Sequence, residues 1–193
     1  MRVSKQPEER RKEILNTAMK LFTEKGLEAT SMRDIAKEMN VVPGLCYRYF
    51  DSKQTLFQEA MDEYVKDCSA QFLRIIHDDS KSFEERFNRL YAAIASEEDT
   101  AVYHRFYHQQ GNESLHEQLA IKICQYVYPH LLTEVKKWAA STNRKIKNPE
   151  LLIHFILYGQ ISILADRQMP MKKNLDCIQH YIDLLFKSET IPE

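Results

Sequence analysis

The sequence predicts an all-α protein with two parts, a three-helix domain at residues 1–51 and a larger helical bundle at residues 52–193. Its 193 residues include only 4 glycines, and long stretches rich in Leu, Ile, Ala, Glu, Lys and Gln favour helices over strands. A hydrophobic content of 44% is sufficient to bury a sizeable core. The net charge of −1 is unevenly divided, because residues 1–57 carry 11 Lys and Arg against 8 Asp and Glu. Only the N-terminal part is therefore basic enough to favour a phosphate-rich partner.

The first helix is predicted at residues 7–25. Pro7 suits the first turn, where a missing amide costs no hydrogen bond, and the two glutamates that follow it meet the positive end of the helix dipole. Hydrophobic residues recur at helical spacing from Ile14 to Phe22 and predict one buried face. Gly26 is suited to the left-handed conformation that ends many helices.

Two short helices are predicted next. In "ATSMRDIAKEMN", Ser31 and Asp34 have the spacing of a capping box, and Asn40 is suited to a left-handed stop. Pro43 then begins a third helix of about seven residues, which ends before a long fourth helix begins at Lys53. A helix this short is stable only when it packs against other elements.

The third helix is predicted to have one covered face and one outward face. At about 100° per residue, Cys46 and Phe50 fall on the same side, where they can hold the helix to the first two. Two helices joined by a tight turn, the second sized for a major groove about 12 Å wide, form a helix-turn-helix. Residues 1–51 are therefore predicted to be a DNA-binding domain. The residues on the outward face or its flanks are Gly44, Leu45, Tyr47 and Arg48.

A family resemblance rests on the same residues. The stretch "EILNTAMKLFTEKGLEATSMRDIAKEMNVVPGLCYRYFDSKQTLF" has a first helix ending in F-x-x-x-G and a second helix beginning T-S-x-x-x-I-A. Its third helix carries G-x-x-Y-x-Y-F-x-S-K. In order and spacing, these motifs resemble the N-terminal domain of the TetR family of transcriptional repressors.

The resemblance implies a set of DNA contacts. In the family the second helix faces phosphates, the third helix reads the major groove, and a lysine opening the fourth helix lies beside another phosphate. Leu45 stands where the family has threonine, so a hydrogen bond is lost and contact with a thymine methyl becomes possible. The alternatives are that the tyrosines are core aromatics and that the cations are simply solvated. The matching residues are Thr30, Ser31, Arg33, Pro43, Gly44, Leu45, Tyr47, Arg48, Tyr49 and Lys53.

The C-terminal bundle is predicted to contain helices near 82–95 and 99–110, a break at Gly111 and Asn112, and a longer helix to about 140, followed by a loop at "STNRKIKNPE" and two last helices. Residues 151–165 are apolar nearly all round, which indicates that two faces of that helix are covered. One face belongs to the bundle, and the other is predicted to meet a second copy. We therefore expect a homodimer formed through the helices at 149–167 and 171–187.

Aromatic residues are concentrated in the bundle. Such a stripe is more often ordinary core than a ligand site, but rings mixed with polar groups such as Gln160 are also typical of a small-molecule pocket. The family resemblance favours the pocket, because these repressors usually carry an effector site there. The predicted pocket residues are Tyr91, Tyr103, Tyr107, Tyr126, Trp138, Phe155 and Tyr158.

Catalytic and metal sites are not predicted. His104 and His108 have the spacing of a metal pair, yet Arg105 stands where the H-E-x-x-H pattern requires glutamate. No Gly-rich phosphate loop, nucleophile elbow or acidic metal cluster is present, and the 4 cysteines are too far apart in the sequence for a zinc or disulfide framework. We expect no enzyme activity, no cofactor and reduced cysteines.

The sequence also predicts where the protein acts. The polar, charged stretch after Met1 is unlike a signal peptide, and the longest apolar run at 151–165 is too short to span a membrane. We therefore expect a cytoplasmic, homodimeric repressor that a small molecule releases from a palindromic operator. The alternatives are an architectural DNA-binding regulator without an effector and, third, a metal or haem sensor using His104 and His108.

Overall fold

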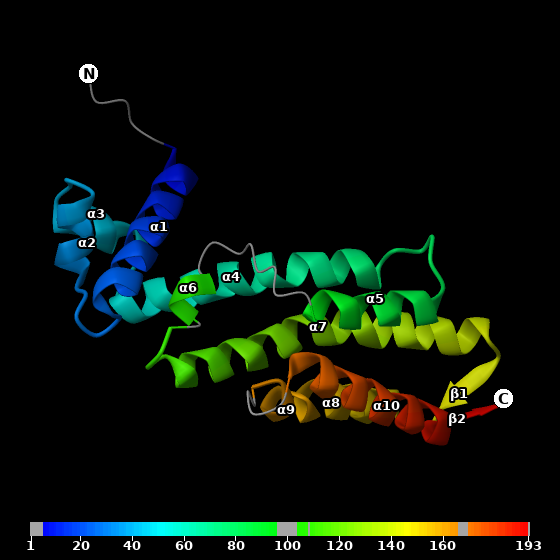
Figure 1. Cartoon of the computed structure of the whole chain (residues 1–193). Coiled ribbons are helices and arrows are strands. Elements are labelled where there is room, and N and C mark those ends of the chain that lie inside the picture. The colour runs from blue at the N-terminus through cyan, green and yellow to red at the C-terminus, as the bar shows by residue number, and fades with distance from the viewer. Residues whose placement is uncertain (1–5, 96–103, 108, 166–169, 193) are drawn as a thin grey trace. The chain divides into compact units, whose positions relative to one another are not determined.

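The computed structural model describes residues 6–95, 104–107, 109–165 and 170–192 (Figure 1). The fold is the predicted all-helical one, and it divides into two compact units. The N-terminal unit comprises Met1–Tyr64 and Ala101–Leu115, and the C-terminal unit comprises Val65–Thr100 and His116–Glu193. Within the described ranges, no helix combines the length and the apolar character that crossing a bilayer demands.

The N-terminal unit contains α1 (Pro7–Lys25), α2 (Met32–Glu38), α3 (Pro43–Tyr49) and the first part of α4 (Lys53–Ile76). Figure 1 shows α1, α2 and α3 grouped beside the start of α4. The division between the units lies within α4 and not at the predicted boundary of 51/52. The reason is that the first half of α4 buries its apolar side chains in the N-terminal core. These side chains are Leu56, Phe57, Ala60, Met61 and Tyr64.

The local signals that end and begin these helices are present as predicted. The Ser31 hydroxyl oxygen accepts a hydrogen bond from the Asp34 backbone amide, and the Asp34 carboxylate accepts one from the Ser31 amide, which completes a capping box. A hydrogen bond that the Ser31 hydroxyl donates to the Asp34 carboxylate, together with the one from the Ser31 amide, holds the pKa of the Asp34 carboxyl below its ordinary value. Asn40 and Gly26 have positive φ angles of 53° and 90° after α2 and α1.

A short helix from later in the chain completes the N-terminal core. In α6 (His104–Tyr107), Phe106 and Tyr107 are both buried. The Tyr107 ring stacks on Tyr64 with centroids 4.7 Å apart, and Phe106 meets Phe57 edge to face at 5.9 Å. Aromatic pairs in these arrangements contribute more than their buried area alone. Residues 104–107 are therefore held to the DNA-binding unit, which the sequence did not predict.

The C-terminal unit is a helical bundle. Figure 1 shows the last three helices, in yellow to red, beside the green helices of the same unit. Its elements are the end of α4, α5 (Phe83–Ala95), α7 (Glu113–Ser141) from His116 onward, α8 (Pro149–Gly159), α9 (Ile161–Ala165) and α10 (Met171–Glu189).

Two predictions for the C-terminal unit were wrong in detail. The helix predicted at 149–167 is interrupted at Gln160, between α8 and α9. The segment predicted as a plain loop contains a strand, β1 (Arg144–Ile146), which pairs antiparallel with β2 (Thr190–Pro192). The strand follows a left-handed Asn143, and its Ile146 is buried in the core. The pairing partner lies over 40 residues away in sequence, so local patterning gave no sign of it.

A buried carboxylate ties three segments of the bundle together. Glu134 on α7 is 3% exposed and accepts hydrogen bonds from Arg86 at 2.7 Å and Lys137 at 2.8 Å. Arg86 also donates to the Ile76 carbonyl at the end of α4. Burial by itself raises the pKa of the Glu134 carboxyl, but the bonds from Lys137 and Arg86 outweigh it and hold the pKa below its ordinary value.

Removing this carboxylate should destabilise the fold. Glu134→Ala leaves the buried Arg86 guanidinium with only the distant, exposed carboxylate of Asp79 at 3.8 Å, so we expect the free energy of unfolding to fall by about 3–5 kcal/mol in urea denaturation. The matched control is Glu150→Ala, whose exposed pair with Lys136 should contribute less than about 1 kcal/mol. Because the folded-state pKa of Glu134 is lowered, its contribution is present at neutral pH and is lost as the pH falls through that pKa. Equal losses for both variants would contradict this account.

Candidate functional site

The outward face of α3 is the centre of the predicted DNA-binding surface. Cys46 and Phe50 are buried, and α3 packs against α2, as the helical spacing predicts. Tyr47 is 50% exposed and Arg48 is also exposed, although exposed large aromatics are few among the residues that the structure describes. Within the described residues, the Arg48 guanidinium has no hydrogen-bond or ion-pair partner. A large ring and an unpaired cation are thus adjacent on a helix whose size fits the major groove of DNA.

The N-terminal end of α3 adds an apolar contact surface. Pro43 and Gly44 are exposed, and Leu45 is half-buried. Val42, the N-cap residue of α3, is 71% exposed and was missed by the sequence reasoning. The signal was available, because a proline at the first helical position places the preceding residue at the cap, outside the packed face. Val42 and Leu45 together can contact thymine methyl groups.

The residues predicted around α2 divide into two groups. Ser31 and Arg33 are exposed and can reach phosphates, although the Ser31 hydroxyl already takes part in the capping box. Thr30 is only 1% exposed, and its hydroxyl donates to the Gly26 carbonyl at 2.9 Å. Its side chain therefore anchors the end of α1 and cannot make the DNA contact that the resemblance implies. A buried hydroxyl needs such an internal partner.

Tyr49 is half-buried and is the last residue of α3, where its backbone makes a contact within the N-terminal unit. Its carbonyl accepts a hydrogen bond from Arg11 Nη1 at 2.9 Å. The Arg11 guanidinium also lies 4.5 Å from the centroid of the Phe50 ring and pairs with Glu59 on α4. Arg11 thus joins α1, the end of α3 and α4, a positioning role that the sequence did not reveal.

The Lys53 side chain does not point freely outward, as it would if its only role were to contact a phosphate. Its ammonium donates to the carbonyls of Leu27 at 2.8 Å and Glu28 at 3.4 Å, and the side chain is 18% exposed. It therefore closes the loop between α1 and α2. An ammonium has three N–H groups, so one remains for a phosphate while the other two hold the loop.

Lys53→Met should consequently have two effects. The lost hydrogen bonds should lower the free energy of unfolding by about 1–3 kcal/mol. The lost phosphate contact should weaken binding to all duplexes and reduce the slope of log affinity against log salt by about 0.9 per subunit. The control is Lys66→Met, an exposed lysine of the C-terminal unit, which should change neither quantity. An unchanged salt slope for Lys53→Met would show that the lysine has only the structural role.

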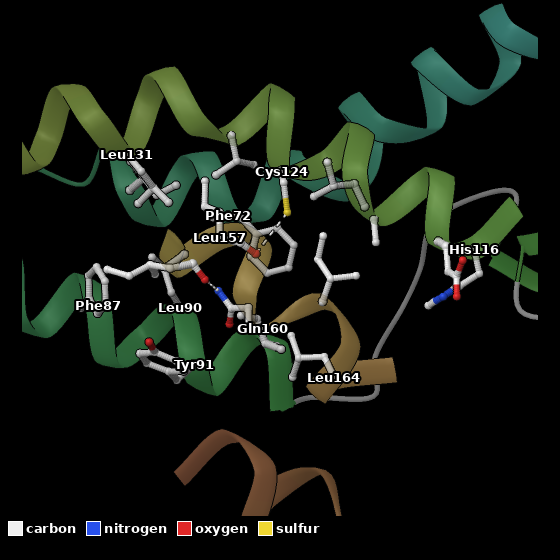
Figure 2. Close-up of a pocket in the computed structure, with 18 residues that line it drawn as sticks. Phe72, Phe87, Leu90, Tyr91, His116, Cys124, Leu131, Leu157, Gln160 and Leu164 are labelled. Carbon is white, nitrogen blue, oxygen red and sulfur yellow. Dashed lines mark hydrogen bonds between the residues drawn. The ribbon is translucent and has the colours of Figure 1, made fainter. Parts of the chain in front are cut away.

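The C-terminal unit contains a partly open cavity of about 330 Å³ (Figure 2). Its wall is mostly apolar, with side chains from α4, α5, α7, α8 and α9, including Phe72, Phe87, Leu131 and Leu164. Figure 2 shows Gln160 among these residues and His116 toward one end. A cavity of this size and character is typical of a small-molecule site.

Of the predicted pocket aromatics, Tyr91 lines the cavity, as does the predicted polar residue Gln160. Burial raises the pKa of the Tyr91 hydroxyl, with a further contribution from Asp183, so this phenol is neutral. Tyr103 lies outside the described residues. Tyr107 belongs to the N-terminal core described above.

The other predicted aromatics do not line the cavity. Trp138 stacks on Phe83 with centroids 5.0 Å apart, and Tyr158 stacks on His154 at 5.5 Å. Tyr126 is half-buried with its ring 6.1 Å from that of His130, and Phe155 is 64% exposed. These rings fill the core or face outward, because aromatic side chains pair with one another where the helices meet. Phe72 and Phe87 line the cavity instead.

The predicted histidine pair cannot be assessed, since the His104 side chain and all of His108 lie outside the described residues. Among the residues that are described, no group of three or more His, Cys, Asp and Glu side chains could hold a metal ion. The four cysteines all lie in the described part of the chain and form no disulfide in the structure.

Comparison with known proteins identifies the N-terminal unit. Residues 14–60 match the family of bacterial regulatory proteins described as the tetR family. A transcriptional repressor of Rhodococcus jostii, KstR2, is 35% identical over 98 residues, which cover 49% of this chain and 48% of that protein. IcaR of Staphylococcus epidermidis, a negative transcriptional regulator of a biofilm operon, is 27% identical over 124 residues, 55% of this chain and 65% of that protein.

The chain spans about half the length of the KstR2 relatives that it matches, 48% and 42%. A solved structure covers nearly all of it: a TetR-family transcriptional regulator from Pectobacterium atrosepticum, with a TM-score of 0.63 at 16% identity. That alignment covers 98% of this chain and all of the other. Likeness at this identity establishes the fold. The matched family is one of regulators and not of enzymes, in agreement with the prediction that the chain has no catalytic activity.

Proposed function

We propose that this chain, whose residues 14–60 match the tetR family of bacterial regulatory proteins, is a TetR-family regulator that represses transcription by binding a palindromic operator as a homodimer. A small-molecule effector in the C-terminal cavity would release it. Its place of action would be the cytoplasm, where a bacterial chromosome lies. The observation that carries the proposal is the outward face of α3, where Tyr47 and Arg48 are exposed without a structural role in the described residues.

DNA binding is supported by the division of roles between α2 and α3. Arg33 on α2 is exposed and can meet a phosphate, which sets the position of the domain without reading sequence. Arg48, Val42 and Leu45 lie on or beside the face of α3, where a guanidinium can pair with guanine and apolar groups with thymine methyls.

Dimerisation is supported by an apolar face on the last helices that the protomer leaves uncovered. Leu151 and Phe155 lie one turn apart on α8 and are 69% and 64% exposed. Tyr181 and Leu184 are three apart on α10 and are 64% and 48% exposed. Large apolar side chains exposed at helical spacing mark an interaction site, and a second copy of the same face is a self-complementary partner. The two copies would each present one α3 to the duplex.

Release by an effector is supported by two helices that contribute to both units. α7 begins at Glu113, shortly after the Phe106 and Tyr107 anchors of the N-terminal core, and its residues 116, 117 and 120 line the cavity. α4 begins at Lys53 and contributes Phe72 and Ile76 to the same wall. A ligand shifts the DNA-binding equilibrium only by its different affinity for the two states.

The test is duplex binding measured by fluorescence anisotropy at rising salt concentration. The proposal predicts that log affinity falls linearly with log salt, with a slope set by the phosphates contacted. A protein that does not bind duplex DNA even at low salt would refute it. If duplex binding is found but no cavity ligand changes it, the effector-independent regulator is the better description.

A further inference from the structure

Two histidines from different segments of the C-terminal unit face each other. His77 is the residue that follows α4, and His130 lies within α7. The Nε2 atom of His77 is 2.9 Å from the Nδ1 atom of His130, and the ring centroids are 5.1 Å apart. The two residues are 53 positions apart in the sequence, so no spacing motif indicated the pair.

Both rings are accessible from solvent, and their separation suits a shared ion. The His77 side chain is 42% exposed, and His130 is half-buried. In the hydrogen bond between them, one nitrogen is the donor and the other is the acceptor. A metal ion bound to both nitrogens, with bonds of about 2.0–2.1 Å at angles of about 90–110°, would set them roughly 2.9–3.4 Å apart. The rings therefore need to move little to hold one.

A buried carboxylate lies at the other nitrogen of His77. The Oε1 atom of Glu134 is 3.4 Å from His77 Nδ1. A carboxylate in this position favours the tautomer with the hydrogen on Nδ1, which leaves the lone pair on Nε2. Metal-binding histidines in proteins commonly have such a partner. Glu134 is itself held by Arg86 and Lys137, so a fixed group orients the His77 ring.

The imidazole nitrogens determine which class of metal ion this pair can bind. Neutral imidazole suits Cu²⁺, Ni²⁺ and Zn²⁺, whereas Mg²⁺ and Ca²⁺ prefer oxygen ligands. The described residues offer no group of three His, Cys, Asp or Glu ligands, so water molecules would fill the remaining coordination positions. On binding, His130 Nδ1 gives its hydrogen to solvent and Nε2 of the same ring takes one up, so that both rings stay neutral.

We propose that His77 and His130 form a binding site for a divalent transition metal ion of this class, with His77 Nε2 and His130 Nδ1 as its two protein ligands. The site goes beyond the proposed function, because neither DNA nor a cavity ligand takes part in it. Ile76 and Leu131, which follow and precede no other residue of the pair but adjoin it in the sequence, line the cavity. A bound ion would join the end of α4 to α7 beside that wall and stabilise the bundle.

Isothermal titration calorimetry of the full chain with NiCl₂ and with ZnCl₂ at neutral pH tests the site. The chain used carries His108→Ala, because His104 and His108 have the spacing of a second metal pair in the sequence. We expect one ion to bind per chain, and the melting temperature to rise with the concentration of the ion. MgCl₂ at the same concentration should produce neither effect.

Two substitutions in this chain remove one imidazole ligand each. His77→Gln and His130→Asn keep a hydrogen-bonding group near the position of the lost nitrogen, so each variant should stay folded without metal. Each should lower the affinity for Ni²⁺ and Zn²⁺ at least about tenfold, because even groups that only orient a metal ligand contribute about 10–100-fold. His180→Gln, at an exposed histidine on α10, is the matched control and should leave the affinity unchanged.

The proposal is overturned if neither ion binds, or if His77→Gln and His130→Asn bind the ions as tightly as the parent chain. Binding that is lost in His180→Gln and kept in the other two variants would also overturn it, since the ion would then lie elsewhere. Should one of the two ligand variants unfold, the other decides. These measurements contain no DNA, so their outcome is separate from the test of repression.

Discussion

Arg48→Ala is expected to remove most of the preference of the protein for its own DNA sequence. A bidentate arginine–guanine pair contributes roughly 1–3 kcal/mol of discrimination, and a symmetric dimer would carry one such pair in each half-site. The substitution should spare the fold, because Arg48 is exposed and has no hydrogen-bond or ion-pair partner in the described part of the chain. Fluorescence anisotropy on the preferred duplex and a scrambled duplex measures the ratio of the two affinities directly.

The matched control for this prediction is Arg33→Ala. Arg33 is an exposed arginine on α2 that can contact a phosphate. Losing that contact should weaken binding to the preferred and to the scrambled duplex alike. The two variants thus distinguish an arginine that recognises the base sequence from one that only positions the domain on the DNA backbone. If Arg48→Ala lowers affinity for both duplexes equally, or leaves discrimination intact, then α3 does not read the sequence through this residue.

Phe155→Glu is expected to turn a dimer into monomers. The side chain is 64% exposed in the protomer, so the protomer should stay folded, but in a dimer the new carboxylates would be buried against an apolar face without cations. Sedimentation equilibrium at micromolar concentration should give the monomer mass. Duplex affinity should fall at least about 100-fold, because each monomer reaches only one half-site.

Ile121→Glu provides the control for the dimer interface. It places the same charge at an exposed apolar position on α7, which is not one of the two helices proposed for the interface, and should leave the dimer intact. A Phe155→Glu protein that remains dimeric would place the interface elsewhere. A wild-type protein that is monomeric under these conditions would contradict the dimer altogether.

The parts of this fold that the sequence predicted are those set by local chemistry. Ser31 and Asp34 are three residues apart and cap α2 with each other, and Asn40 ends it through its own backbone conformation. The burial of Cys46 and Phe50 follows from helical spacing alone. None of these features needs a distant partner, so a single stretch of sequence contains the whole signal.

The features that were missed depend on distant partners. Phe106 and Tyr107 lie in the N-terminal core because their rings pack against those of Phe57 and Tyr64. The residues next to them in the sequence do not indicate this packing. Lys53 is directed to the loop after α1 by the carbonyl of Leu27, over 20 residues away. Trp138 was expected to line the cavity but packs against Phe83, while Phe72, Phe87 and aliphatic residues from several helices surround the open space.

The central claim is that this chain binds a specific, symmetric DNA sequence through paired α3 helices. Selection of duplexes from a random pool by the wild-type protein, followed by sequencing, tests it most directly. The account predicts enrichment of a palindrome whose half-sites are centred about one helical turn apart, roughly 34–36 Å or slightly more. It further predicts that Arg48→Ala selects the same palindrome with a guanine position relaxed in each half-site. A pool that shows no enrichment, or that converges on an asymmetric sequence, would contradict it.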